Sequence, residues 1–128
     1  MALEDRCVWR QAAKGDKIVD RWDEGRDVLF IATGAVEVVN YVSGLKISHD
    51  IIGAGGYVGE IAALDGEERS AIIVATNECV VACMAPEVFR ELLRDNPAIA
   101  EKVLVRLARI VRECNLRIKI LSAPQLGA

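Results

Sequence analysis

A short stretch in the middle of the chain, GGYVGEIAALDGEERSA at 55–71, combines acidic residues, one arginine and many small residues. Arg69 brings a permanent charge and a planar set of donors that fits two phosphate oxygens. Glu60 would repel a phosphate, but its carboxylate can accept hydrogen bonds from hydroxyls beside one, as on a ribose. Gly55, Gly56 and Gly59 allow close approach of the backbone to a ligand. These residue types indicate a site for a phosphorylated sugar of low charge.

The element expected to position these groups is a short helix from Glu60 to Leu64. The first N–H groups of a helix lack partners inside it and attract a phosphate, helped by the helix dipole. Ala62 and Ala63 would leave that end open. From the residues alone a plainer alternative stays open, in which Glu60 pairs with Arg69 and the stretch only crosses between strands.

A catalytic role would fall on the remaining carboxylates of the stretch, Asp65, Glu67 and Glu68. They lie in DGEE, a composition typical of a turn, and the single histidine, His49, is the one further candidate base. The four cysteines are scattered without CxxC spacing, so buried thiols are a better interpretation than metal ligands or disulfides. We therefore expect no catalytic residue, no metal and no cofactor.

The bulk composition predicts one soluble domain, with 128 residues of which 52% are hydrophobic and 27% charged. No apolar run approaches a membrane span and no signal peptide is evident, so a cytoplasmic setting is expected. The net charge is −3, but the charge is unevenly distributed, because segment 97–121 is basic, with six Lys and Arg against two Glu. This segment could touch nucleic acid, but a solvated helix face is the better interpretation, and no direct nucleic-acid binding is expected.

Short β-prone runs and turn signals alternate along the first two thirds of the chain. They predict strands at 17–19, 28–33, 35–42, 45–52, 71–76 and 79–84. Strands of this length and spacing predict an antiparallel roll or sandwich. Residues 1–14 carry only a weak helical pattern, which predicts a short N-terminal helix.

After Met84 the pattern becomes helical. One helix is expected in 85–96, and a second begins at Pro97 with Asn96 as its N-cap. The second helix carries a heptad seam, with apolar residues three and four apart: Leu104, Leu107, Val111, Cys114, Ile118 and Leu121. The seam could pack on the roll or pair with its copy in a homodimer, and residues 122–128 are expected to be a tail.

The stretch at 55–71 resembles the phosphate-binding cassette of the cyclic nucleotide-binding domain family. The family pattern is Gly-Glu, an aliphatic residue, Ala, a variable loop, Arg, a small residue and Ala. It is matched in order and spacing by Gly59, Glu60, Ile61, Ala62, Arg69, Ser70 and Ala71. The upstream run GDKIVDRWDEGRDVLFIATGAVEVV and the downstream run FRELLRDNPAIAEKVLVRLARIV resemble the family's early strands and late helices, so the resemblance covers residues 14–121.

The resemblance implies a mainly β fold with flanking helices. A double-stranded antiparallel β-roll (jelly roll) at 15–84 would precede C-terminal helices at 86–121, between the 1–14 segment and the 122–128 tail. The ligand would be cAMP or cGMP, with Arg69 on the cyclic phosphate and Glu60 on the ribose 2′-OH. Backbone N–H groups of Ile61, Ala62 and Ala71 would add contacts. Trp22, Val58 and Ala63 depart from the family pattern without removing a ligand-contacting group.

The resemblance also suggests how the base is held and what binding does. Ser70 favours cAMP over cGMP, and Val38 and Ile52 align with apolar positions that line the base. On the last helix Ile110 would be a cap, with Cys114 and Asn115 reaching the adenine. The alternative that Cys114 is only a seam residue and Asn115 only solvated stays open.

The implied function is a non-catalytic regulatory module that relays nucleotide occupancy through its C-terminal helix. An effector domain could be linked to it in a parent protein. A nucleotide-silent roll that serves only for dimerisation is the alternative, and the presence of Glu60 and Arg69 argues against it.

Overall fold

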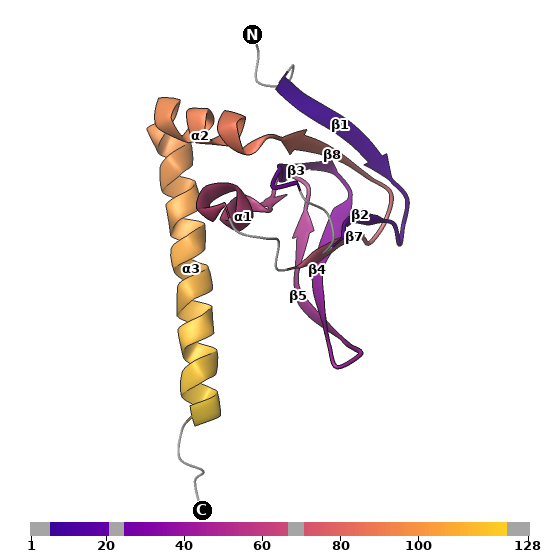
Figure 1. Cartoon of the computed structure of the whole chain (residues 1–128), viewed down its shortest axis with the longest axis vertical. Coiled ribbons are helices and arrows are strands. Elements are labelled where there is room, and N and C mark those ends of the chain that lie inside the picture. Colours follow the sequence, from indigo (N-terminus) through magenta and orange to yellow (C-terminus); the bar gives the residue numbers. More distant parts are fainter. Residues whose placement is uncertain (1–5, 21–24, 67–70, 123–128) are drawn as a thin grey trace, which may run out of the picture. The chain divides into compact units, whose positions relative to one another are not determined.

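The structure is a computed structural model that describes residues 6–20, 25–66 and 71–122. Over these residues the chain forms eight strands and three helices (Figure 1). The elements in chain order are β1 (Cys7–Ala12), β2 (Lys17–Val19), β3 (Val28–Thr33), β4 (Ala35–Val42), β5 (Leu45–Gly53), β6 (Tyr57–Val58), α1 (Glu60–Asp65), β7 (Ile72–Ala75), β8 (Cys79–Met84), α2 (Pro86–Asp95) and α3 (Pro97–Ser122).

The strands form two four-stranded antiparallel sheets, with strand orders β1-β8-β3-β6 and β2-β7-β4-β5. One hydrophobic core joins them, because it contains side chains from both sheets, among them Leu29, Ile31, Val36, Ile73 and Val81. Full burial of an aliphatic side chain of this size contributes about 1.5–3 kcal/mol. The predicted antiparallel β-roll followed by C-terminal helices is confirmed.

The N-terminal segment differs from its prediction. Residues 7–12 form strand β1 rather than a helix, and they pair with β8 from Cys7 opposite Met84 to Ala12 opposite Cys79. The helix expectation was wrong, and the roll begins at Cys7 rather than at residue 15. The physical reason is that β8 offers this segment a row of backbone hydrogen-bonding groups, which outweighs a weak local helical preference.

The turn between β3 and β4 requires a glycine. Gly34 has a φ of +81°, and a Cβ there would lie 2.3 Å from the backbone O of Glu78 and 2.6 Å from the Cβ of Cys79. The Ala35 N–H donates to Asn77 Oδ1 at 2.9 Å. This turn is therefore packed tightly against the connection between β7 and β8.

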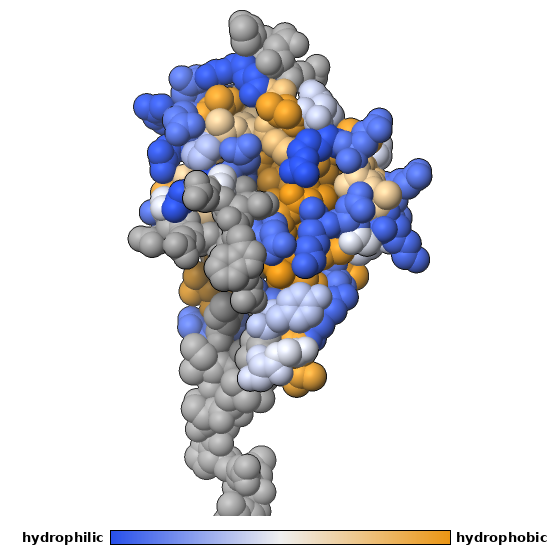
Figure 2. Space-filling view, turned by 45° about the vertical axis from the view of Figure 1, so that its right-hand side comes forward, coloured by the Kyte–Doolittle hydropathy of each residue, from blue (hydrophilic) through white to orange (hydrophobic). Residues whose placement is uncertain are grey.

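Strands β4 and β5 form a long hairpin whose surface is mixed in character. Several large apolar side chains are exposed on it, namely Tyr41, Leu45, Ile47 and Ile51. Lys46 Nζ lies 2.8 Å from Glu37 Oε1, and the hydrogen bond from Lys46 lowers the pKa of Glu37. Figure 2 likewise shows apolar surface bordered by hydrophilic side chains on the face that it displays.

The chain divides into two compact units, Met1–Arg90 and Glu91–Ala128. The second contains the predicted long helix, α3, in which the first seam residues Leu104 and Val111 are 65% and 57% exposed and Leu107 is half-buried. No helix in the described part of the chain is long and apolar enough to cross a membrane. Among the same residues, no group of three or more His, Cys, Asp or Glu could hold a metal ion.

Candidate functional site

The predicted cassette helix is present as α1, Glu60–Asp65. It follows β6, which pairs with β3 through Val58 opposite Leu29 and Tyr57 opposite Phe30. Glycines in the left-handed conformation stand at both ends, Gly59 with a φ of 91° and Gly66 with a φ of 74°. A residue with a Cβ is strained in this conformation, so the two glycines set where the helix starts and stops.

The glycine-rich loop before β6 is fixed to β3 by backbone hydrogen bonds. Gly55 N–H donates to Ile31 O at 2.8 Å, and Ile31 N–H donates to Gly56 O at 2.9 Å. A Cβ on Gly56 would lie 2.4 Å from Cγ2 of Ile52, one of the two predicted base-lining residues on the strands. Because Gly56 has no side chain, the loop can lie directly against Ile52.

Glu60 is the one buried charged residue in the described part of the chain, with 3% of its surface exposed. It stands at the first position of α1. Burying a carboxylate is costly unless the group is hydrogen-bonded. The cassette pattern predicts that Glu60 contacts a ribose hydroxyl, and that contact stays a prediction.

The buried side of α1 after Glu60 carries small side chains. Ala62 and Ala63 are buried, whereas Ile61 is 49% exposed. Ala63 N–H donates to Gly59 O at 3.2 Å, the first hydrogen bond of the helical turn. The N–H groups of Ile61 and Ala62 precede it and belong to the first turn, whose donors have no acceptor within a helix. These are the donors predicted to contact the phosphate, and that contact stays a prediction.

The middle of the cassette is not covered by the structure. Arg69 and Ser70 lie outside the described residues, as do Glu67, Glu68 and Trp22. The phosphate contact of Arg69, its alternative pairing within the cassette and the base preference drawn from Ser70 therefore stay predictions.

The last cassette residue is described. Ala71 is half-buried and directly precedes β7. The structure thus places the two ends of the cassette, α1 and Ala71, on the roll. The backbone contact of Ala71 with the phosphate stays a prediction.

The structure brings together the two predicted base-lining residues of the roll. Ile52 on β5 is opposite Val36 on β4, so Ile52 and Val38 lie on the same face of the sheet. Ile52 is buried in the core, and Val38 is partly buried against it. Their predicted contact with the base stays a prediction.

The other predicted base contacts come from α3, in the second unit. Ile110 is half-buried and Asn115 is exposed, whereas the side chain of Cys114 is not among those described. Their predicted contact with the base stays a prediction.

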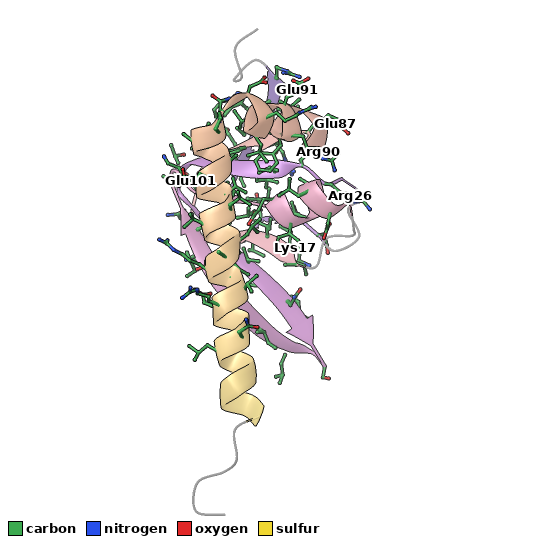
Figure 3. The ribbon with its side chains drawn as sticks, turned by 90° about the vertical axis from the view of Figure 1, so that its left-hand side faces the viewer. Lys17, Arg26, Glu87, Arg90, Glu91 and Glu101 are labelled. Atoms are coloured by element: carbon green, nitrogen blue, oxygen red, sulfur yellow. The ribbon has the colours of Figure 1, made fainter. Side chains whose placement is uncertain are left out.

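One contact of α1 was not foreseen from the sequence. Arg90 Nη2, on α2, donates to the backbone O of Ala63 at 3.0 Å and lies 3.5 Å from the O of Leu64 (Figure 3). An arginine on an amphipathic helix gives no local sign of such a role. The available signal was in α1, whose last turn contains no basic residue to interact with its own carbonyl groups.

Comparison with known sequences identifies relatives of this fold and cassette. The sequence model of one protein family, "Cyclic nucleotide-binding domain", matches residues 9–96. The cyclic AMP receptor protein of Thermus thermophilus is 30% identical over 110 residues, which make up 85% of this chain and 51% of that protein. The cAMP-dependent protein kinase regulatory subunit of Yarrowia lipolytica is 33% identical over 86 residues, 67% of this chain and 22% of that subunit. The chain thus spans about half the length of the first relative and less of the second.

Comparison of structures agrees. The crystal structure of the Thermus thermophilus catabolite activator protein superimposes with a TM-score of 0.84 at 28% identity, covering 94% of this chain and 57% of that one. A Thermotoga maritima transcriptional regulator shares the fold at 17% identity, with a TM-score of 0.83 over 95% of this chain and 96% of that one. With the family's sequence model matching 88 of 128 residues (9–96), the chain belongs to the cyclic nucleotide-binding domain family.

Proposed function

We propose that this chain is a regulatory module that binds cAMP in preference to cGMP and has no catalytic activity or cofactor of its own. The observation that carries the proposal is Glu60, a buried carboxylate at the start of a short helix bounded by two left-handed glycines. The preference for cAMP is supported by Ser70 and by the names of the two relatives, a cyclic AMP receptor protein and a cAMP-dependent kinase subunit.

In this proposal the cassette binds the ribose and the cyclic phosphate. Arg69 pairs with the exocyclic phosphate oxygens, and backbone N–H groups of Ile61, Ala62 and Ala71 donate to the same group. Glu60 accepts a hydrogen bond from the ribose 2′-OH. The single negative charge of a cyclic phosphate suits one arginine without a metal ion. Gly59 lets the backbone approach, and Val38 and Ile52 contact the base.

The test is a calorimetric titration of the chain with cAMP and with cGMP, repeated with Arg69→Ala. Loss of a charge-assisted contact is expected to weaken cAMP binding by about tenfold to a hundredfold. Arg94→Ala, which removes an exposed arginine on α2, is the matched control and should bind as the unaltered chain does. Unchanged affinity of Arg69→Ala would refute the role assigned to Arg69. Absence of heat and of any thermal shift at millimolar nucleotide would favour the nucleotide-silent roll instead.

The relay is the second part of the proposal. Nucleotide binding shifts the position of α3 if the bound state favours one of its arrangements, with Ile110, Cys114 and Asn115 closing over the base. The exposed seam residues Leu104 and Val111 support a homodimer through 97–121. Backbone hydrogen exchange over 97–121 should slow on addition of cAMP. Identical exchange with and without cAMP would reject the relay and leave the binding proposal intact.

A further inference from the structure

Helix α1 needs support from outside itself. It has six residues, and an isolated helix of this length is not stable in water. Gly66 N–H donates to Ala62 O at 3.0 Å, and the carbonyls of Ala63 and Leu64 follow it, where a helix offers no further donors of its own. A cation near these carbonyls is favoured by the helix dipole, yet the last turn of α1 has none.

Arg90 supplies that cation from α2. Its Nη2 donates to Ala63 O at 3.0 Å and lies 3.5 Å from Leu64 O, at the end of α1 opposite to Glu60. Figure 3 shows Arg90 on the side of α2 that faces α1. Both ends of α1 are thus held: Gly59 caps the start, and at the end Arg90 adds hydrogen bonds to the cap formed by Gly66.

The position of Arg90 is itself fixed by its neighbour in the sequence. Phe89 is 1% exposed, and its ring centroid lies 6.4 Å from that of Phe30 on β3. Phe30 also contacts Tyr57, at 5.9 Å, on the strand that leads into α1. The rings of Phe89, Phe30 and Tyr57 therefore connect α2 to the strand just before α1. Arg90 adds a second connection from α2, to the carbonyls at the end of α1.

We propose that Arg90 is a positioning residue for the nucleotide, which holds α1 in the orientation that presents Glu60 and the first-turn N–H groups to the ribose and phosphate. This inference rests on the proposed function. In this proposal Arg90 acts through its contacts with the carbonyls of α1, so its effect is on the fraction of molecules in which α1 is correctly placed. Apparent affinity falls in proportion to that fraction.

The experiment compares Arg90→Met, which keeps the aliphatic stem and removes the donors, with Arg90→Lys and with the control Arg94→Met. Arg90→Met should raise the dissociation constant for cAMP by about five- to tenfold, because a hydrogen bond from a charged group is lost at a partly buried site. Arg90→Lys retains a cation and should bind within about twofold of the unaltered chain. Arg94→Met should bind normally.

Hydrogen exchange distinguishes positioning from general stability. In nucleotide-free Arg90→Met, the amides of Ala63 and Gly66 should exchange faster while those of β3 and β8 keep their rates, and saturating cAMP should restore the α1 rates. Normal affinity of Arg90→Met, or an equal loss in Arg94→Met, would overturn the proposal. Faster exchange throughout the roll would also overturn it, because Arg90 would then act on the whole fold.

Two further outcomes are separable. If the unaltered chain binds no nucleotide, the proposed function fails, whereas the α1 exchange rates still show whether Arg90 holds the helix. If Arg90→Met does not fold, Arg90→Gln replaces it, since its shorter side chain carries no charge. Unchanged affinity and unchanged α1 exchange in Arg90→Gln would then overturn the proposal.

Discussion

The roll uses the same residue types in a packed setting and in an exposed one. Gly34, at the turn before β4, has a φ of +81° and no space for a Cβ, whereas Gly44, at the tip of the β4–β5 hairpin, has the same φ with nothing within 4 Å of the Cβ position. Glu60 is buried at the start of α1, whereas Glu37 lies on the hairpin and pairs with the exposed Lys46.

The difference shows which positions the fold constrains. A glycine with a positive φ is required by conformation at both turns, but only Gly34 is also required by packing. A buried carboxylate must be matched by specific partners, whereas an exposed ion pair is screened by solvent and exchanges easily with water. Substitutions at the packed positions should therefore have large effects on folding or binding, and the same substitutions on the hairpin should have small ones.

The largest expected effect is on stability, from Gly34→Ala. The added Cβ would meet the backbone O of Glu78 at 2.3 Å, so either the β3–β4 turn or the β7–β8 connection must move. We expect the free energy of unfolding to fall by about 3 kcal/mol or more. Gly44→Ala has only the conformational cost of a positive φ and should lose about 1 kcal/mol. Denaturation in urea measures both, and equal losses would contradict the packing argument.

The next effect is on nucleotide affinity, from Glu60→Gln. The amide keeps the size of the side chain but removes the charge that strengthens a hydrogen bond from the ribose hydroxyl. We expect cAMP binding to weaken by about tenfold. Glu37→Gln on the hairpin should leave the affinity unchanged. Titration with 2′-deoxy-cAMP is the sharper control, because Glu60→Gln should discriminate less than the unaltered chain between cAMP and this analogue. Undiminished discrimination would show that Glu60 does not contact the 2′-OH.

Most of the fold follows from the sequence because buried strands leave a strong local pattern. The run CVVACM at 79–84 became β8, whose residues are nearly all buried between β1 and β3. Strand β1 is an edge strand with an exposed middle, so its sequence has no apolar alternation that would distinguish it from other segments. Strand β6 has two residues and depends on pairing with β3. Long-range pairing decides both elements, and a single sequence does not encode it locally.

The sequence also predicted part of the candidate site. The types and order of the cassette residues predicted the helix α1 and singled out Glu60, because glycines and small residues around a glutamate and an arginine are typical of a loop that binds a phosphorylated sugar. The contact between Arg90 and Ala63 was not predicted, since the two residues are 27 positions apart and belong to helices whose packing is set by the aromatic row. The burial of Glu60 also required the structure, because its sequence neighbours Gly59 and exposed Ile61 do not indicate it.

The smallest expected effect concerns the ion pair of the hairpin. Lys46 lowers the pKa of Glu37 below its ordinary 4.5, chiefly by a hydrogen bond. The folded state therefore binds a proton less readily than the unfolded state, so the contribution of Glu37 is complete above pH 4.5 and is lost as the pH falls through the folded pKa. The pKa of Lys46 shifts in the opposite direction, because the hydrogen bond with Glu37 raises it above 10.5. The contribution of Lys46 to stability is therefore lost only as the pH rises beyond 10.5.

A double-mutant cycle of Glu37→Gln and Lys46→Met tests this at pH 7 and at pH 3. Unfolding in urea should reveal a small coupling energy at pH 7 that shrinks at pH 3, where Glu37 is increasingly protonated. High salt should reduce the coupling at pH 7 as well, because the side chain of Lys46 is 55% exposed and that of Glu37 keeps 17% of its surface in contact with solvent. A coupling that keeps its full size at pH 3 and in high salt would mean that the two side chains interact by packing rather than by charge. In that case the side chains of the hairpin would contribute to stability by packing, as the buried side chains of the roll do, despite the exposure of Lys46.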